Sequence, residues 1–333
     1  MQNQRAQAPV LTPFLTPAAQ TQALSVAVIL PCYNEEAAIA TVVADFKKAL
    51  PDAKVYVYDN NSKDRTCEVA AAAGAIVRKE TLQGKGNVVR RMFADIDADI
   101  YLMCDGDVTY DAASAPALID KLIGENLDMV VGCRVDKEVA AYRPGHRFGN
   151  ALFTGSVAYL FGNRFTDILS GYRAFSRRFV KSFPALSNGF EIETELTVHA
   201  LELRMPIGEL DTPYGARLEG SQSKLSTFRD GYRILMMITK LFKNERPLFF
   251  YAIIFGLLAL LAVGISVPVV LTYLDTGLVP RLPTAVLAAS TMLLGFLALT
   301  CGLILDTVTH GRREIKRLAY LRVSSTRELA KLN

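Results

Sequence analysis

The sequence predicts a largely parallel, doubly wound α/β domain followed by a transmembrane helical hairpin. From Val26 onward, short apolar runs of strand length alternate with segments of helical periodicity. Polar clusters follow several of these runs, at the carboxyl ends of strands where such sheets bind ligands. Near the end of the chain, Leu248–Leu274 and Pro283–Leu305 carry almost no charge. These three observations together predict a two-part protein.

Turn and cap signals separate the elements of the α/β domain. Glu35 and Glu36 precede the first helix, and Gly74 closes the second. The predicted strands are Val26–Leu30, Lys54–Tyr58, Ala75–Val77, Ile100–Cys104, Met129–Gly132, Gly171–Phe175 and Ile207–Pro213. The predicted helices are Ala37–Leu50, Arg65–Ala73, Asn87–Ala94, Ser114–Gly124, Arg147–Leu160 and Ile192–Leu203. This alternation indicates a mostly parallel sheet with helices on its faces.

The two apolar stretches are each long enough to cross a bilayer, and Asp275–Leu282 joins them. A buried core helix is the alternative for one such run, but two in succession favour a hairpin. Basic residues flank the pair, whereas the connecting segment offers only Arg281. The flanking residues are Arg229, Arg233, Lys240, Lys243, Arg246, Arg312, Arg313, Lys316 and Arg317. The positive-inside rule then predicts a multi-pass protein of the cytoplasmic (inner) membrane with both termini in the cytosol.

Composition shifts along the chain predict five regions. Residues 1–22, rich in Gln, Ala, Thr and Pro, are expected to form a flexible tail, because they lack the pattern of a signal peptide. The α/β domain is expected over 23–225, and two transmembrane helices within 247–309. Residues 226–246 show an amphipathic pattern that predicts a helix on the bilayer surface, with a core helix as the alternative. A cytosolic tail is expected over 310–333.

Composition also excludes several classes of function. The five cysteines form no CxxC pair, and the three histidines are widely spaced, so no structural zinc site is predicted. The cysteines are expected to be reduced and mostly buried. The formal charge of +4 is small for 333 residues, so no nucleic-acid-binding surface is expected.

Asp105-Gly106-Asp107 directly follows a predicted strand, so two carboxylates project past its end with one small residue between them. Mg²⁺ or Mn²⁺ keeps several waters and takes one or two protein carboxylates together with the oxygens of a substrate diphosphate. The motif therefore predicts a divalent-cation site on Asp105 and Asp107. An ordinary acidic turn is the alternative.

Five short motifs follow one another along the chain. They are Pro31-Cys32-Tyr33-Asn34-Glu35-Glu36, Asp59-Asn60-Asn61-Ser62-Lys63-Asp64-Arg65-Thr66, Asp105-Gly106-Asp107, Asp167-Ile168-Leu169-Ser170-Gly171-Tyr172-Arg173 and Arg217-Leu218-Glu219-Gly220-Ser221-Gln222-Ser223-Lys224. In order and spacing they resemble the family 2 glycosyltransferases of the GT-A fold. With the two apolar stretches, the resemblance is to the polyprenyl-phosphate glycosyltransferases, the group containing dolichyl-phosphate mannose synthase and bacterial undecaprenyl-phosphate glucosyltransferases. It covers about Val26–Leu305.

The resemblance implies a set of residues that contact a nucleotide-sugar donor. They are Pro31, Tyr33, Glu35, Asp59, Asn60, Lys85, Asp105, Gly106 and Asp107. Turn capping is the alternative for Tyr33 and Asp59, and a solvated loop charge is the alternative for Lys85. The second motif departs from the common Asp-Asp-Asn-Ser pattern, because Asn60 replaces a carboxylate with an amide. Any role that needs a second negative charge there is in doubt.

A lipid-phosphate acceptor calls for cations, because arginine offers a planar fork to phosphate oxygens and lysine a point charge. By resemblance, Arg134 and Arg147 would take the acceptor phosphate, with Arg217 and Lys224 on a loop that reaches the phosphates. Surface ion pairing is the alternative for each. Arg173 is a further candidate for contacting the phosphate, and the weakest one.

Asp167 is a further candidate catalytic residue beside Asp105 and Asp107, as a contact for the sugar or the acceptor. Its alternative role is to cap the turn at Ser170-Gly171.

The function that the resemblance implies is the inverting transfer of a hexose from a nucleotide diphosphate sugar to polyprenyl (undecaprenyl or dolichyl) phosphate, in cell envelope glycan biosynthesis. UDP-glucose is the first candidate donor, and a GDP-mannose-dependent mannose synthase is the main rival. The sequence is also compatible with a processive polysaccharide synthase or with a non-catalytic scaffold that binds nucleotide sugars. The expected partners are donor, lipid acceptor, membrane and Mg²⁺ or Mn²⁺; whether the chain forms a homo-oligomer stays open.

Overall fold

The computed structural model describes residues 24–136, 155, 166–189, 191–215, 236 and 239–332. The tail expected over 1–22 and almost all of the helix predicted for Arg147–Leu160 lie outside these residues. So does most of the amphipathic segment predicted over 226–246.

Within the described residues, the α/β domain is built on one mixed sheet with the strand order β3-β2-β1-β4-β6-β5-β7. The strands are β1 (Val26–Cys32), β2 (Lys54–Asp59), β3 (Ile76–Lys79), β4 (Ile100–Met103), β5 (Met129–Asp136), β6 (Arg173–Ser176) and β7 (Ile207–Tyr214). Of these described strands, only β6 runs antiparallel, to β4 on one side and to β5 on the other. The predicted largely parallel sheet is therefore confirmed, and the chain order reverses at β1.

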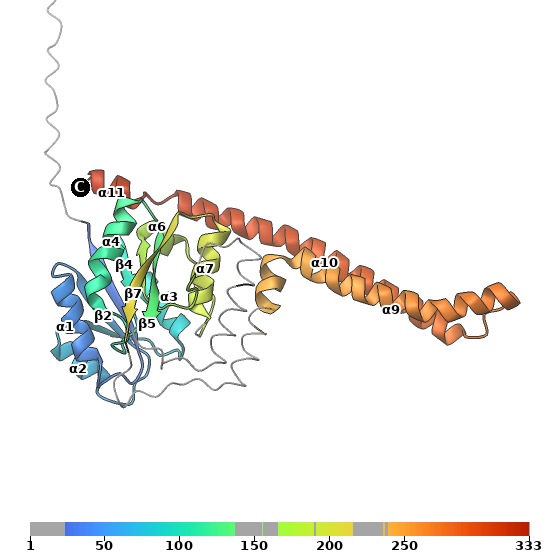
Figure 1. Cartoon of the computed structure of the whole chain (residues 1–333), viewed down its shortest axis with the longest axis horizontal. Helices are drawn as coiled ribbons and strands as arrows, with labels where there is room; N and C mark the ends of the chain where they lie inside the picture. Colours follow the sequence, from blue (N-terminus) through green and yellow to red (C-terminus); the bar gives the residue numbers. More distant parts are fainter. Residues whose placement is uncertain are drawn as a thin grey trace, which may run out of the picture.

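Helices cover both faces of this sheet (Figure 1). They are α1 (Ile39–Ala49), α2 (Thr66–Ala72), α3 (Lys85–Asp95), the short 3₁₀ helix η1 (Ala112–Ser114), α4 (Ala115–Gly124), α6 (Arg177–Ser182) and α7 (Ile192–Glu202). The sequence pattern did not predict α6, which begins where the Ser176 hydroxyl accepts a 3.2 Å hydrogen bond from the backbone N–H of Phe179.

The central strand β1 is buried on both faces. Val28 and Leu30 belong to the apolar cluster under α1 and α4, whereas Ala27 and Ile29 belong to the cluster under α3 and α7. This explains why the strand reads as a continuous apolar run rather than as an alternation. It also places the end of β1 at the centre of the domain.

Two long helices follow, α9 (Pro247–Thr276) and α10 (Leu282–Leu321), with the short α11 (Thr326–Leu332) after them. Figure 1 shows α9 and α10 lying side by side and projecting away from the α/β domain. Both are long and apolar enough to cross a membrane. In the most apolar window of α9 only 6% of the residues are buried, which argues against the core helix of a soluble protein. Both predicted spans therefore coincide with long helices.

Small residues let α9 and α10 approach closely. Ala288, Gly295, Gly302 and Thr309 recur every seventh position on α10, and all four are buried. A methyl group added to Gly302 would lie 2.8 Å from Cβ of Tyr251 on α9. The seam therefore depends on the absence of a side chain at this position.

The C-terminal end of α10 docks on the α/β domain. Arg313 and Lys316 form ion pairs of 3.1 and 2.7 Å with the buried Glu202 at the end of α7. The phenol of Tyr320 donates a 2.7 Å hydrogen bond to Asp128, which precedes β5. The part of the expected tail that the structure describes thus continues α10 and forms α11.

Candidate active site

The loops after β1, β2 and β4 meet at the carboxyl ends of these adjacent strands, as the sequence predicts. The buried thiol of Cys32, the last residue of β1, reports their convergence. Burial raises the pKa of Cys32, and Glu35, Asp105, Asp59 and Asp107 raise it further through their charges. A methyl group added to Gly106 would lie 2.7 Å from Sγ of Cys32 and 3.8 Å from Cγ of Glu35, so the loops after β1 and β4 are in contact.

Hydrogen bonds join the loop after β1 to the loop after β2. The backbone N–H of Asn34 donates to the Ser62 hydroxyl at 2.8 Å, and the Asn34 side chain accepts from the N–H of Lys63 at 2.8 Å. The N–H of Glu35 donates to the Thr66 hydroxyl at 2.9 Å. Asn34 has a φ of 55°, a left-handed conformation that asparagine adopts more readily than most residues. Pro31, Tyr33 and Glu35, in the same region of the chain, are half-buried.

Asp59, at the end of β2, carries a buried oxygen without a partner. The residue is 2% exposed, and its Oδ2 accepts a 3.2 Å hydrogen bond from the N–H of Ser62. Its Oδ1 is buried and accepts no hydrogen bond from any described residue. A buried carboxylate oxygen normally has a donor. Asp59 is therefore suited to accept a hydrogen bond from a ligand hydroxyl or N–H.

Asn60 holds the loop that leads into α3. Its Nδ2 donates to the carbonyls of Glu80 and Leu82 at 2.9 and 2.8 Å, while its Oδ1 accepts from the N–H of Gly84 at 2.7 Å. A carboxylate could not donate to the two carbonyls, which explains the amide at this position. The structure gives Asn60 the role of holding this loop in place. Its direct contact with the nucleotide sugar stays a prediction.

The Asp105-Gly106-Asp107 turn is packed tightly on its neighbours. A methyl group added to Gly106 would lie 2.7 Å from Sγ of Cys32, so only glycine fits there. Asp107 is 5% exposed, and its Oδ1 accepts from the Thr109 hydroxyl at 2.5 Å. A methyl group on Gly171 would lie 2.7 Å from Oδ2 of Asp105. The fourth motif of the sequence thus packs directly against the third.

The oxygen ligands present fit a divalent cation whose coordination a substrate completes. Asp105 and Asp107 supply hard carboxylate oxygens, and the Asp105 side chain is 31% exposed. Among the described residues, no cluster of three or more metal-ligating side chains is present. One or two carboxylates suffice for Mg²⁺ or Mn²⁺ when diphosphate oxygens and waters supply the other ligands.

Lys85 lies between two carboxylates rather than in solvent. Its Nζ is 2.5 Å from Oδ1 of Asp105 and 2.6 Å from Oε1 of Glu193 on α7. Burial opposes the charge, but Asp105 and Glu193 outweigh it and raise the pKa of Lys85. The alternative of a solvated loop charge is wrong, since the side chain is only 10% exposed.

Arg134 and Asp167 form a two-pronged ion pair. Nε of Arg134 is 2.7 Å from Oδ2 of Asp167, and Nη2 is 2.8 Å from Oδ1. Burial alone would raise the pKa of Asp167, but the Arg134 guanidinium holds it below its usual range. The Arg134 guanidinium also lies over the Tyr214 ring, 5.6 Å from its centroid. Of the other predicted phosphate-binding residues, Arg147, Arg217 and Lys224 lie outside the described residues.

Arg173, the weakest candidate for phosphate binding, is a buried structural residue. It is 0% exposed and donates to the carbonyls of Ser170, at 2.9 Å, and Ile168. It also donates to the Thr197 hydroxyl at 2.8 Å. Burial lowers the pKa of Arg173 to about 10. These contacts leave it no access to a lipid phosphate, so this candidate is wrong.

Two residues near Asp105 and Lys85 were not predicted from the sequence. Glu193 reads as an ordinary acidic residue in the first turn of a helix, although it is 5% exposed. Tyr110 accepts a 2.9 Å hydrogen bond from the N–H of Gly171 and feels the charges of Asp105, Arg134 and Lys85. Neither residue lies in a recognisable motif, so only tertiary structure reveals its place.

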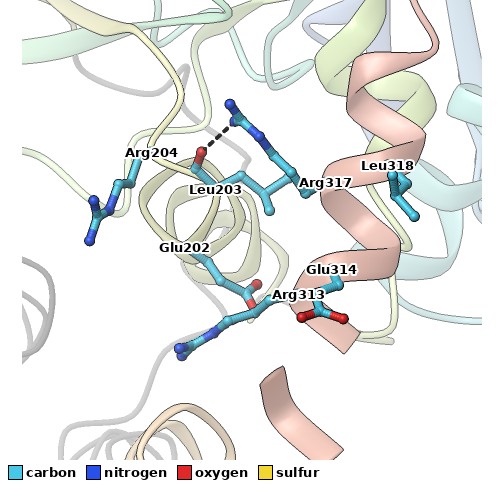
Figure 2. Close-up of a pocket in the computed structure, with 7 residues that line it drawn as sticks. All are labelled: Glu202, Leu203, Arg204, Arg313, Glu314, Arg317 and Leu318. Atoms are coloured by element: carbon cyan, nitrogen blue, oxygen red, sulfur yellow. Dashed lines mark hydrogen bonds and ion pairs between the residues drawn. The ribbon is translucent and has the colours of Figure 1, made fainter. Parts of the chain in front are cut away.

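A pocket of about 560 Å³ lies elsewhere, between the end of α7 and α10 (Figure 2). Arg317 donates to the carbonyl of Leu203 at 2.9 Å, and Arg313 pairs with Glu202. The arginines of α10 that line it are engaged with α7. We therefore interpret the pocket as part of the docking seam rather than as the donor site.

Comparison with known proteins identifies the family. The family model described as "Glycosyl transferase family 2" matches residues 27–183. The chain is 34% identical over 304 residues to glycosyltransferase AglJ of Haloferax volcanii, which covers 89% of this chain and 98% of that protein. The chain therefore belongs to glycosyl transferase family 2, and it is a glycosyltransferase. Membership in this family of enzymes sets aside the non-catalytic scaffold.

One further relative and one solved structure of similar fold extend this result. The dolichyl-phosphate hexose transferase of Haloferax volcanii is 30% identical over 220 residues, which cover 66% of this chain and 95% of that protein. A solved structure of glucosyl-3-phosphoglycerate synthase from Mycobacterium tuberculosis, in complex with Mn²⁺, UDP and glucosyl-3-phosphoglycerate, matches with a TM-score of 0.55 at 24% identity. That match covers 66% of this chain and 79% of the other. It supports the GT-A fold predicted for the α/β domain.

Proposed function

We propose that this glycosyltransferase moves a hexose from a nucleotide diphosphate sugar onto the phosphate of a polyprenyl lipid, with inversion at the anomeric carbon. The observation that carries the proposal is the cluster of acidic residues at the ends of β1, β2 and β4, where Gly106 packs against Cys32 and Glu35 and Gly171 packs against Asp105. This cluster belongs to a domain joined to two helices able to cross a membrane. The relative named dolichyl-phosphate hexose transferase supports a lipid phosphate as acceptor. UDP-glucose is the first candidate donor, and GDP-mannose the rival.

The charges at the ends of these strands explain the need for a cation. Lys85 pairs with Asp105 and Glu193, and Arg134 pairs with Asp167. Three further carboxylates lie nearby, those of Glu35, Asp59 and Asp107. A nucleotide diphosphate brings more negative charge, so it needs a counter-charge on entry. A divalent cation on Asp105 and Asp107 would supply it and would stabilise the departing diphosphate.

A phosphate acceptor needs no strong general base, because its oxygen is already ionised near neutral pH. The geometry of Asp167 agrees with this, since both of its oxygens accept from Arg134. We assign to Asp167 the task of orienting Arg134, whose planar guanidinium would receive the acceptor phosphate. Arg147, Arg217 and Lys224 are proposed as further phosphate contacts. The protein then contributes position and charge stabilisation.

We also propose that α9 and α10 cross the cytoplasmic membrane with the catalytic domain in the cytosol. The proposed regions remain a tail over 1–22, a catalytic domain over 23–225, a surface helix over 226–246 and two spans within 247–309. At the described end of the surface segment Lys240 and Lys243 are exposed, whereas Leu241 belongs to the apolar cluster under α3 and α7. The segment 310–333 would lie in the cytosol.

A direct assay tests this function. Membranes containing the protein are incubated with undecaprenyl phosphate and labelled UDP-glucose or GDP-mannose, and the label in the lipid phase is measured. We expect transfer from one donor, loss of transfer in Asp105→Asn and Asp107→Asn, and normal transfer in Asp120→Asn, which changes an exposed aspartate on α4. Normal turnover in both Asp105→Asn and Asp107→Asn would contradict the metal site. A polymeric product would favour a processive synthase instead.

A further inference from the structure

The buried Glu193 shares the Lys85 ammonium with Asp105. Nζ of Lys85 lies 2.5 Å from Asp105, in the loop after β4, and 2.6 Å from Glu193 on α7. Lys85 is the first residue of α3, and Glu193 lies in the first turn of α7. The Glu193 side chain is 7% exposed. A buried, charged carboxylate is stable only with a cation or hydrogen-bond donor beside it, and for Glu193 that partner is Lys85.

The structure fixes the start of α7, and with it the position of Glu193. Arg173 donates to the Thr197 hydroxyl at 2.8 Å, and this hydroxyl donates to the backbone carbonyl of Glu193 at 3.1 Å. Arg173 is itself completely buried. The Glu193 carboxylate is therefore held by a rigid element rather than by a flexible loop.

The same helix holds the turn that carries Lys85. The Glu195 carboxylate accepts hydrogen bonds from the backbone N–H groups of Leu186 and Ser187 at 2.8 and 2.7 Å. The loop so fastened packs on the glycines beside Lys85, because a methyl group on Gly86 would lie 2.1 Å from the carbonyl oxygen of Ser187. Backbone and ammonium of the Lys85 turn are thus both positioned from α7.

The sharing decides how much charge Asp105 offers to a cation. An ammonium has three N–H donors, so it can serve two carboxylates at once. Asp105 and Lys85 alone would form a neutral pair, with which a divalent cation must compete. With Glu193 present, the group of three carries one net negative charge, and the Lys85 ammonium divides its N–H donors between Asp105 and Glu193.

We propose that Glu193 is a positioning residue of the metal and diphosphate site. Because Glu193 shares the Lys85 ammonium with Asp105, it keeps the Asp105 carboxylate available to the divalent cation that binds with the nucleotide sugar. This rests on the proposed function, in which Asp105 holds that cation. Glu193 acts through Lys85 and touches neither donor nor acceptor. Lys85, retained by Glu193, stays beside the entering diphosphate.

Metal binding without any transfer reaction tests the role of Glu193. The full chain in detergent is titrated with Mn²⁺ in the presence of UDP or, in a parallel arm, GDP, and the electron paramagnetic resonance signal of free Mn²⁺ gives the bound fraction. Loss of a residue that orients a metal ligand typically weakens metal affinity by about 10- to 100-fold. We expect such a loss in Glu193→Gln, and wild-type affinity in Glu191→Gln, which removes an exposed carboxylate from the same end of α7.

The double variant Glu193→Gln/Lys85→Met separates this role from a merely structural one. It also removes the competing ammonium, so with UDP or GDP at saturating concentration we expect Mn²⁺ affinity to rise above that of Glu193→Gln. Damage to the fold would instead add to the first defect. Unchanged Mn²⁺ affinity in Glu193→Gln, or a double variant as weak as the single one, overturns the proposal.

The titration also distinguishes this proposal from the proposed function. A failure of lipid-phosphate transfer leaves the Mn²⁺ measurement intact, because the acceptor is absent from it. If the wild-type chain binds no Mn²⁺ with either nucleotide, the metal site and the role of Glu193 are both wrong.

Discussion

The phenol of Tyr320 donates a 2.7 Å hydrogen bond to the carboxylate of Asp128, a residue 192 positions earlier in the chain. Arg178 of α6 contacts the other oxygen of Asp128 at 2.5 Å, and its guanidinium lies over the Tyr320 ring. Asp128 is 1% exposed. One buried carboxylate therefore joins the end of α10 to the start of β5 and to α6.

Tyr320→Phe should weaken this junction. The change removes a hydrogen bond to a charged acceptor, which contributes about 1.5–3 kcal/mol to stability. We expect the midpoint of thermal unfolding in detergent to fall by several degrees. Tyr273→Phe, at an exposed position near the end of α9, is the matched control. Equal midpoints for Tyr320→Phe and wild type would show that the junction does not stabilise the protein.

Asn60→Asp should disturb the loop before α3. The change removes both donors to the carbonyls of Glu80 and Leu82 and sets a negative charge beside them. Each buried group left without a partner costs about 1–3 kcal/mol. We expect lower thermal stability and a several-fold rise in the KM for the nucleotide sugar, because this loop leads into Lys85. The exposed Asn61→Asp should show a smaller effect on both, and a KM equal to wild type in Asn60→Asp would contradict the structural role.

His199 should make stability depend on pH. Its ring lies edge-on to Phe179 and Phe183, and burial, together with the charge of Lys316, lowers the pKa of His199 to about 3. The unfolded chain binds a proton below about pH 6.5, whereas the folded chain does not. Stability is therefore fully present above pH 6.5 and falls by up to about 1.4 kcal/mol per pH unit below it.

His199→Gln should remove this dependence. The difference in unfolding midpoint between pH 7 and pH 4.5 should be smaller in the variant than in wild type. His310→Gln, at an exposed position on α10, should leave the difference unchanged. An unaltered pH profile in His199→Gln would show that the buried ring is not its source.

Gly302→Leu should separate α9 from α10. Even a first carbon at this position lies 2.8 Å from Cβ of Tyr251 and 3.4 Å from the backbone of Leu248. A side chain there forces the two helices apart, since backbone atoms cannot move aside cheaply. We expect earlier thermal unfolding and faster proteolysis of the detergent-solubilised protein. Gly264→Leu, on α9 where nothing lies within 4 Å, should behave as wild type.

Local patterns predicted the fold well. The apolar runs of β1, β2 and β4 and the helices between them were placed within a few residues, because strand and helix periods are properties of neighbouring residues. The acidic motifs at the strand ends were found for the same reason. Their convergence followed from the rule that ligands bind beyond the carboxyl ends of parallel strands.

Contacts between distant residues were not predictable in this way. The pairing of Lys85 with Glu193 and the burial of Arg173 depend on how α3, α7 and β6 pack, and a single sequence carries no sign of it. The docking of α10 on Glu202 was hidden for another reason. Arg313 and Lys316 read as flanks of a membrane span, and only the structure shows that they also bind the α/β domain.

The uninterrupted length of α10 sets a distance. From Leu305, the end of the predicted span, to Tyr320 the helix rises about 22 Å, at 1.5 Å per residue. Tyr320 is hydrogen-bonded to Asp128, which directly precedes β5. From Asp128 the chain extends about 20 Å along β5 to Arg134, at 3.3 Å per residue. A helix and a strand, both rigid, thus connect the end of the proposed span to the proposed phosphate-binding arginine. The number of residues in these two elements limits how far Arg134 can lie from that end.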